Sequence, residues 1–142
     1  MRIMVRKANG GLASVCNLYG NRTLFCHGSV SAVSFTSTSD QSVKEDVQDV
    51  DLSPVFDAVS CKSYRRTDKP ELGRRCGFIS QDVARACASA GVPDTFTADI
   101  QQDDGTTLLG LDYARMCCLL FSKVKQLEAR LRTIEIAIES AP

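Results

Sequence analysis

An apolar repeat in the C-terminal segment constrains the fold more than any other feature of this sequence. From Tyr113 onward the apolar residues step by four and three without a break. As a heptad, the a positions are Cys117, Val124, Leu131 and Ile138, and the d positions are Tyr113, Leu120, Leu127 and Ile134. A repeat of about four heptads predicts a long helix, within residues 112–142, that packs on copies of itself as a coiled coil. The mixture of leucine and β-branched residues leaves a dimer and a trimer both open.

Charged residues beside this repeat indicate how the helices associate. Lys123 and Arg130 occupy g positions, and Glu128 and Glu135 occupy the e positions that follow them. Opposite charges at g and at the next e join neighbouring chains in a parallel, in-register coiled coil. The pattern therefore favours parallel association of identical chains.

The alternative interpretation is one amphipathic helix packed on its own domain. Phe121 and Met116 widen the apolar stripe in that direction. We expect self-association instead, because a helix that packs only on its own domain does not need a strict period over several heptads.

Residues 39–111 predict a small domain of the α+β class. Apolar spacing, turn formers and helix caps place short helices and strands along this stretch. The expected elements are a charged helix after Asp40 with Val43, Val47 and Val50 on one face, a helix at 53–59 capped by Ser53, strands at 61–66 and 75–79, a helix at 82–89 stopped by Gly91, and strands at 96–101 and 106–109 joined through Asp103, Asp104 and Gly105. Two hairpins therefore bracket one helix.

Residues 1–38 differ from the rest in composition and predict β structure. Short runs suited to strands lie at 12–16, 22–26 and 29–35, and turns that contain glycine separate them. Strands this short do not bury enough apolar surface on their own. We therefore expect this segment to depend on partners, for example as strands wrapped with those of other chains in an elongated fibre.

The junction between these two regions carries a candidate nucleophile and a candidate base. Ser39 and Lys44 lie five residues apart, with Asp40 directly after the serine. A serine hydroxyl becomes a good nucleophile when a base removes its proton, and lysine acts as that base only as the neutral amine. Lys44 therefore needs burial or a neighbouring cation. The cations that the sequence offers for this role are Arg65, Arg66, Arg74 and Arg75.

The spacing of Ser39 and Lys44 limits how the two side chains meet. On a regular helix, residues three or four apart share a face, so an offset of five needs an irregular turn. Otherwise the lysine reaches the serine of another chain, and the reaction would depend on assembly. Taken by themselves, the two residues also fit an ordinary exposed polar turn.

Composition excludes several classes of function. The chain has 142 residues, and 17 basic side chains balance 17 acidic ones, so no basic surface indicates a nucleic-acid or membrane partner. No apolar run is long enough for a transmembrane helix, and the N-terminus lacks the apolar core of a signal peptide. We therefore expect folding in a cytoplasm.

The cysteines do not form a metal-binding pattern. They occur at positions 16, 26, 61, 76, 87, 117 and 118, no two form a C-x-x-C pair, and His27 is the one histidine. We expect no metal, no cofactor and no disulfide framework. The cysteines are interpreted as small buried hydrophobic residues in a reducing compartment.

Four short sequence words occur in an order that resembles a known family. They are TSTSDQSVKEDV, CKSYRR, GFISQDV and LGLDYARMCCLLFSKVKQLEARL, and the resemblance covers about residues 34–133. Together they resemble the C-terminal intramolecular chaperone and auto-processing domain of phage tail spikes, tail fibres and endosialidases. The same module occurs in the myelin regulatory factor of animals.

The resemblance implies a self-cleaving serine peptidase. In that family a serine, the aspartate after it and a lysine five residues after the serine form the cleavage site, and here they match Ser39, Asp40 and Lys44. With this resemblance, we expect a homotrimer. The implied protein is therefore a bacteriophage chaperone that folds in the host cytoplasm, assembles the upstream fibre or spike chain of the virion, and is then released.

Three further positions match the family. Arg75 stands where many phage members have a histidine that in some supports cleavage, so the arginine either takes over a structural or electrostatic role or leaves cleavage slower. Gln81 and Tyr113 match recurring positions, and we interpret both as structural. Gln81 is expected at the start of a helix, and Tyr113 at the start of the coiled coil.

Two other functions fit parts of the sequence. A non-cleaving oligomerisation and attachment module, retained on the virion, would use the same helix and the same α+β domain. A transcription-factor fragment like the animal relative is disfavoured, because these residues hold no basic DNA-binding element.

Overall fold

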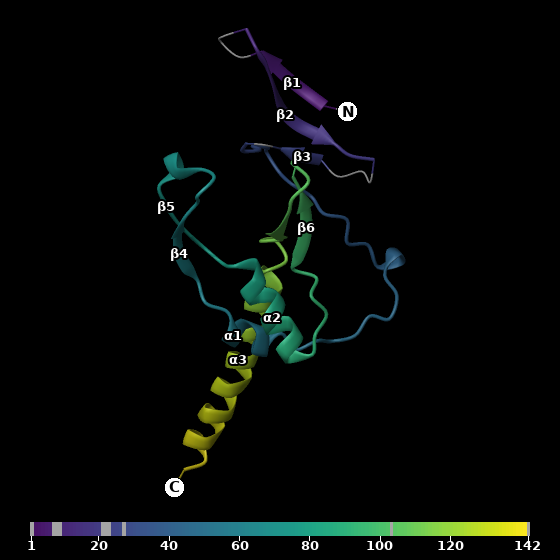
Figure 1. Ribbon diagram of the computed structural model, residues 1–142. Helices are drawn as coiled ribbons and strands as arrows, with labels where there is room; N and C mark the ends of the chain where they lie inside the picture. Colours follow the sequence, from purple (N-terminus) through teal and green to yellow (C-terminus); the bar gives the residue numbers. More distant parts are fainter. Residues whose placement is uncertain (1, 7–9, 21–23, 27, 103, 142) are drawn as a thin grey trace. The chain divides into compact units, whose positions relative to one another are not determined.

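The computed structural model describes residues 2–6, 10–20, 24–26, 28–102 and 104–141 of the chain (Figure 1). His27, Asp103 and the start of the strand expected at 22–26 lie outside the described residues. The chain divides into two compact units, Met1–Val47 and Gln48–Pro142. Ser39, Asp40 and Lys44 belong to the first unit, and the long C-terminal helix belongs to the second.

The described part of the first unit contains a small antiparallel sheet. Its strands are β1 (Arg2–Arg6), β2 (Leu12–Leu18) and β3 (Leu24–Cys26), in the order β1-β2-β3. The β structure expected around 12–16 and 22–26 is thus confirmed for the described residues, and β1 adds a strand that the sequence did not predict. The strand expected at 29–35 is wrong, because this stretch is extended without sheet pairing and its apolar side chains, including Phe35, are exposed.

After Ser39 the chain makes one helical turn rather than the charged helix expected there. The turn is a 3₁₀ helix, η1 (Gln41–Val43), and residues 44–50 are not helical. Asp46 has a φ of 51°, a left-handed value that interrupts a right-handed helix. Val43, Val47 and Val50 are all exposed, so no apolar contact favours the helix.

The second unit contains helices and hairpins, so the α+β class is confirmed. Its elements are α1 (Ser53–Ala58), β4 (Lys62–Arg65), the 3₁₀ helix η2 (Pro70–Leu72), β5 (Arg74–Gly77), α2 (Ser80–Ala90), β6 (Thr97–Gln101), β7 (Thr107–Leu111) and α3 (Cys117–Glu139). Strands β4 and β5 form one antiparallel hairpin and β6 and β7 another, as the sequence predicted. The turn between β6 and β7 contains Gly105 at a φ of +83°, which glycine adopts without a steric penalty.

The core of this unit lies where the three helices meet. The buried apolar residues are Val55, Val83, Ala86, Cys87, Phe96, Met116 and Leu119. Figure 1 shows α1, α2 and the first turns of α3 together, with the rest of α3 extending beyond them. Cys87 behaves as the buried hydrophobe that we expected. Cys61, Cys76, Cys117 and Cys118 are exposed, so that interpretation is wrong for them.

The start of α1 differs from the expected cap at Ser53. The helix begins at Ser53 itself, with Pro54 in its first turn, and the Ser53 amide donates to the Asp51 carboxylate at 2.9 Å. Asp51 therefore satisfies the first backbone donor of the helix. The same carboxylate accepts a hydrogen bond from the Ser122 hydroxyl of α3, so this cap also connects two helices.

Candidate cleavage site at Ser39 and Lys44

A tight turn after Ser39 shapes the candidate site. Asp40 caps η1, because its Oδ1 accepts hydrogen bonds from the Ser42 amide at 2.8 Å and from the Ser42 hydroxyl at 2.6 Å. These hydrogen bonds lower the pKa of the Asp40 carboxyl. The Lys44 amide donates to the Gln41 carbonyl at 3.0 Å and ends the turn. The backbone is extended at Asp40 and at Lys44, so the turn folds the chain back on itself.

This turn brings the two predicted catalytic side chains together. Lys44 Nζ donates to Ser39 Oγ at 2.7 Å and to the Ser39 main-chain oxygen at 3.0 Å. Both distances are normal for hydrogen bonds between charged or polar groups. The irregular turn needed for an offset of five residues is present, and the pair is formed within one chain.

The contact has the geometry of a nucleophile and its base. A base within about 2.6–3.2 Å of a hydroxyl can take its proton, and Lys44 lies in that range. Its second hydrogen bond places the amine against the carbonyl of Ser39. Both side chains are exposed in the single chain.

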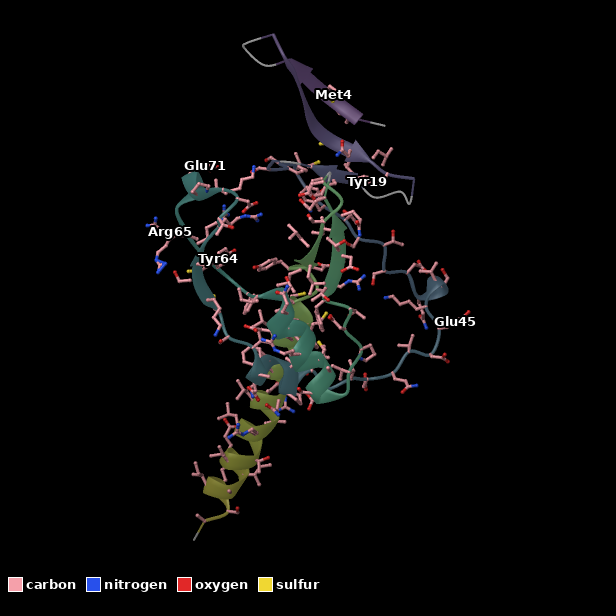
Figure 2. All side chains as sticks on the ribbon, viewed as in Figure 1. Met4, Tyr19, Glu45, Tyr64, Arg65 and Glu71 are labelled. Atoms are coloured by element: carbon pink, nitrogen blue, oxygen red, sulfur yellow. The ribbon has the colours of Figure 1, made fainter. Side chains whose placement is uncertain are left out.

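The arginines suggested as the cation beside Lys44 all belong to the second unit. Arg65 lies directly opposite Arg74 in the β4–β5 hairpin, and Arg75 lies opposite Tyr64; Figure 2 labels Tyr64 and Arg65 on β4. Arg66 binds Asp68 through two hydrogen bonds, at 2.8 and 2.6 Å. The hairpin thus presents a group of cationic side chains, of which Arg66 already has a carboxylate partner.

Gln81 lies in the first turn of α2, where the sequence predicted the start of a helix, and its side chain is exposed.

Tyr113 does not open the long helix, because α3 begins at Cys117. The Tyr113 hydroxyl instead accepts a hydrogen bond from the Phe78 amide at 3.2 Å, and the two rings lie 6.2 Å apart. A Cβ added to Gly77 would lie 2.5 Å from the Tyr113 oxygen, so the tyrosine would have to shift to admit a side chain there. The expected place of Tyr113 at the start of the long helix is therefore wrong, and its place in an interface between chains stays a prediction.

Helix α3 packs on its own unit through a face that does not contain the a and d positions of the heptad repeat, here called the seam. Leu119 is 2% exposed, and Met116 is also buried. Lys123 bonds Asp57 of α1 at 2.8 Å and lies 5.9 Å from the centre of the Phe56 ring. Together with the hydrogen bond from Ser122 to Asp51, these contacts use the c, f and g positions of the repeat, so they leave the a and d positions uncovered.

The a and d side chains of α3 are exposed along its whole length. The exposed members are Cys117, Leu120, Val124, Leu127, Leu131, Ile134 and Ile138. Lys123 was expected to pair with a glutamate of a neighbouring chain, but in the structure it is committed to Asp57 and only 14% exposed. Glu128 pairs within its own helix with Arg132 at 2.9 Å. Lys123 and Glu128, which the g-to-e pattern would pair between chains, therefore both have partners within their own chain.

Sequence reasoning missed the residues that hold the site and the helix in place. Ser42 holds the Asp40 cap, and an Asp-x-Ser spacing is a recognisable signal for such a turn. The Asp57 and Lys123 pair carries no signal, because the two residues are far apart in the sequence.

Two other features are absent from the residues that the structure describes. Within these ranges no three histidine, cysteine or acidic side chains gather at a spacing that would hold a metal ion. No helix in the described part of the chain is long and apolar enough to cross a lipid bilayer.

Comparison with known proteins finds a family similarity for part of the chain. Residues 39–92 match the family model described as Chaperone of endosialidase. The family match covers less than half of the chain, and this segment is similar to members of that family. The match begins at Ser39 and includes Asp40, Lys44, Arg75 and Gln81, so the resemblance expected from the sequence is confirmed for this part of the chain.

The chain is also similar to a solved structure, that of the carboxy-terminal domain of the bacteriophage T5 L-shaped tail fiber with its intra-molecular chaperone domain. The identity is 16% and the TM-score is 0.46, and the match covers 96% of this chain and 44% of that chain. This chain thus spans less than half the length of the chain that it matches. A search of curated proteins found no match.

Proposed function

We propose that this chain is an intramolecular chaperone that trimerises and registers a viral tail fibre or spike and then releases itself by cutting its own backbone beside Ser39. The hydrogen bond between Lys44 Nζ and Ser39 Oγ, 2.7 Å long, carries this proposal. The family match that starts at Ser39 supports it. The pair would act once per chain, because the nucleophile is part of its own substrate.

The reaction begins with a proton transfer. Neutral Lys44 takes the proton of the Ser39 hydroxyl, and the oxygen attacks a neighbouring main-chain carbonyl carbon. The peptide C–N bond breaks, the protonated lysine gives a proton to the leaving nitrogen, and an ester to Ser39 Oγ remains. Water then hydrolyses that ester, which regenerates the hydroxyl and leaves one new carboxylate and one new amine.

Ring size distinguishes the two peptide bonds beside Ser39. Attack by Oγ on the carbonyl of Thr38 closes a five-membered ring, whereas attack on the carbonyl of Ser39 itself would close a strained four-membered ring. The hydroxyl of the same residue therefore favours cleavage between Thr38 and Ser39. Cleavage between Ser39 and Asp40 would indicate that the hydroxyl of another chain is the nucleophile.

Assembly would bury surface that is exposed in the single chain. The exposed a and d side chains of α3 would be buried in a parallel trimer, and burying apolar area contributes about 25 cal/mol per Å². The same association brings further copies of the arginine-bearing β4–β5 hairpin into one particle. A cation or a buried surface near Lys44 would favour its neutral form, so cleavage would follow assembly.

The benefit to the fibre is kinetic. Joining three chains at α3 lowers the entropy cost of bringing their upstream strands into register, because the ends are already held together. Once the chaperone has left, the fibre cannot unfold along the route by which it folded, and its lifetime depends on a high unfolding barrier.

The proposal is tested by denaturing gel electrophoresis of the folded chain. We expect a fragment of residues 39–142, and we expect Ser39→Ala to abolish it because no nucleophile remains. Ser37→Ala is the matched control, since it removes an exposed serine two residues upstream, and it should cut like the wild type. A wild-type chain that folds, assembles and stays whole would leave only the non-cleaving oligomerisation module.

A further inference from the structure

Two cysteines of the first unit lie directly opposite each other in neighbouring strands. Cys16 of β2 pairs with Cys26 of β3 in the antiparallel register. Their Sγ atoms are 2.7 Å apart, and both side chains are half-buried. Strand pairing therefore holds two thiols in contact, although the sequence places them ten residues apart.

This arrangement meets the geometric needs of a disulfide. A disulfide joins residues whose Cα atoms are about 4.4–6.8 Å apart, with its two sulfurs about 2.0 Å apart. Residues directly opposite in an antiparallel pair have Cα atoms about 4.5–5.5 Å apart. The backbone therefore does not have to move, and the sulfurs need to approach by well under 1 Å.

The other cysteines lack this arrangement. Cys76 lies opposite Ser63 in its hairpin, and Cys87 is buried in the helical core. Cys117 and Cys118 are neighbours in the sequence, and adjacent Cα atoms about 3.8 Å apart are too close for an unstrained disulfide. The register thus selects one pair out of seven cysteines.

We propose that Cys16 and Cys26 are a modification site, at which exchange with a small-molecule disulfide of the glutathione type forms an intrachain bridge. One thiolate attacks the small disulfide, which forms a mixed disulfide and expels one small thiolate. The second cysteine then attacks the protein sulfur of that mixed disulfide, which closes the bridge and expels the second small thiolate. In total the protein dithiol loses two protons and two electrons, and one small disulfide is reduced to two thiols.

The bridge would respond to the surrounding medium. A reducing cytoplasm keeps the two thiols reduced during folding, and an oxidising medium closes the bridge afterwards. The pKa of Cys16 is raised because its thiol shares a hydrogen bond with Cys26, so closure should run faster in alkaline solution. Both cysteines precede Ser39, so, if the chain cuts itself as proposed above, the bridge would remain on the fibre side of the cut.

The test is disulfide mapping on the full chain, in the uncut Ser39→Ala variant and in the wild type. The folded protein is treated with oxidised glutathione, the remaining thiols are blocked with N-ethylmaleimide, and the chain is digested with trypsin without reduction. Trypsin cuts after Lys7, Arg22 and Lys44, so Cys16 lies in peptide 8–22 and Cys26 in peptide 23–44. In the Ser39→Ala variant we expect these two peptides linked, and separated by reduction.

The matched controls distinguish this bridge from random oxidation. A Cys61→Ser/Cys76→Ser double variant should keep the linked peptides, whereas Cys16→Ser should lose them. The proposal is overturned if, after treatment with oxidised glutathione, both peptides are unlinked and carry N-ethylmaleimide or glutathione. It is also overturned if Cys16 and Cys26 bridge to other cysteines as often as to each other. Because the mapping uses an uncut variant, its result does not depend on whether the wild type cleaves itself.

Discussion

At the scale of single residues, the candidate site depends on one carboxylate. Asp40 accepts two hydrogen bonds from Ser42, and this cap sets the turn that returns Lys44 to Ser39. Both bonds go to Oδ1, and they are stronger while the carboxylate is ionised because the negative charge makes that oxygen a better acceptor. The turn, and with it the contact between the two catalytic candidates, should therefore respond to acid.

The pH dependence has a definite sign. The folded pKa of Asp40 is lowered below its ordinary value of 3.8 by the Ser42 hydrogen bonds. A lowered pKa contributes to the folded turn above 3.8, and the contribution is lost as the pH falls through the lower, folded value. We expect the Ser42 amide resonance in the Ser39→Ala variant to titrate with a midpoint below 3.8.

Replacement of Ser42 by alanine provides the control for this titration. It removes the hydroxyl donor that is the largest cause of the shift, so the Asp40 midpoint should move back toward 3.8. A midpoint at or above 3.8 in the parent protein, or one that Ser42→Ala leaves in place, would show that this cap does not hold the turn.

At the scale of elements, α3 has one face that packs on its own unit and another, formed by the a and d positions, that is exposed. Leu119 packs in the core, whereas Leu127 is 48% exposed on the seam. Leu119→Ala should lower the free energy of unfolding by about 2–4 kcal/mol, because it leaves a cavity in a packed core. Leu127→Ala should change the unfolding of the dilute single chain by only about 0.5 kcal/mol.

Chemical denaturation of both variants at low protein concentration checks this difference. Self-association measured on the same samples should show the opposite order, with Leu127→Ala weakened more than Leu119→Ala. Equal losses of unfolding free energy would mean that the seam also packs on its own unit.

The sequence predicted elements well where a local rule decided them. The two hairpins follow from alternating strands and a glycine turn, and α2 ends at Gly91, which has a left-handed φ of 67°. Prediction was wrong where tertiary contacts or their absence decided. The valines at 43, 47 and 50 suggested a helix face, but they find no apolar surface to pack on.

The candidate site was predictable only in part. The identity and spacing of Ser39 and Lys44 are visible in the sequence, and the family resemblance gives them a role. The turn that joins them depends on Asp40 and Ser42 together, and the docking of α3 depends on a pair, Asp57 and Lys123, that no sequence spacing connects. Tyr113 fits the heptad by spacing but packs on Phe78 instead, because the helix starts after it.

At the scale of the whole molecule, the proposal requires that chains associate through α3. A charge at a d position of a coiled coil would be buried without a partner, and that cost opposes assembly. Ile134→Asp should therefore convert the trimer into single chains, as measured by mass spectrometry of the native protein. Ile136→Asp is the matched control, because Ile136 is also exposed but occupies an f position off the seam.

The expected result for Ile136→Asp is an unchanged trimer. If both variants remain trimeric, chains associate through another surface, and if the wild type is itself a single chain, α3 is not an oligomerisation helix at the concentration used. Loss of cleavage together with loss of the trimer in Ile134→Asp would link Lys44 activation to assembly.

The central claim is that Ser39 and Lys44 form a self-cleaving pair. The most direct test lets the chain fold, then denatures it and measures the masses present. The account predicts that the wild type and the control Lys62→Met yield two fragments that meet at a bond beside Ser39, whereas Lys44→Met yields one uncut mass. A wild type that assembles yet remains uncut, or a Lys44→Met chain that is cut as fast as the wild type, would contradict it.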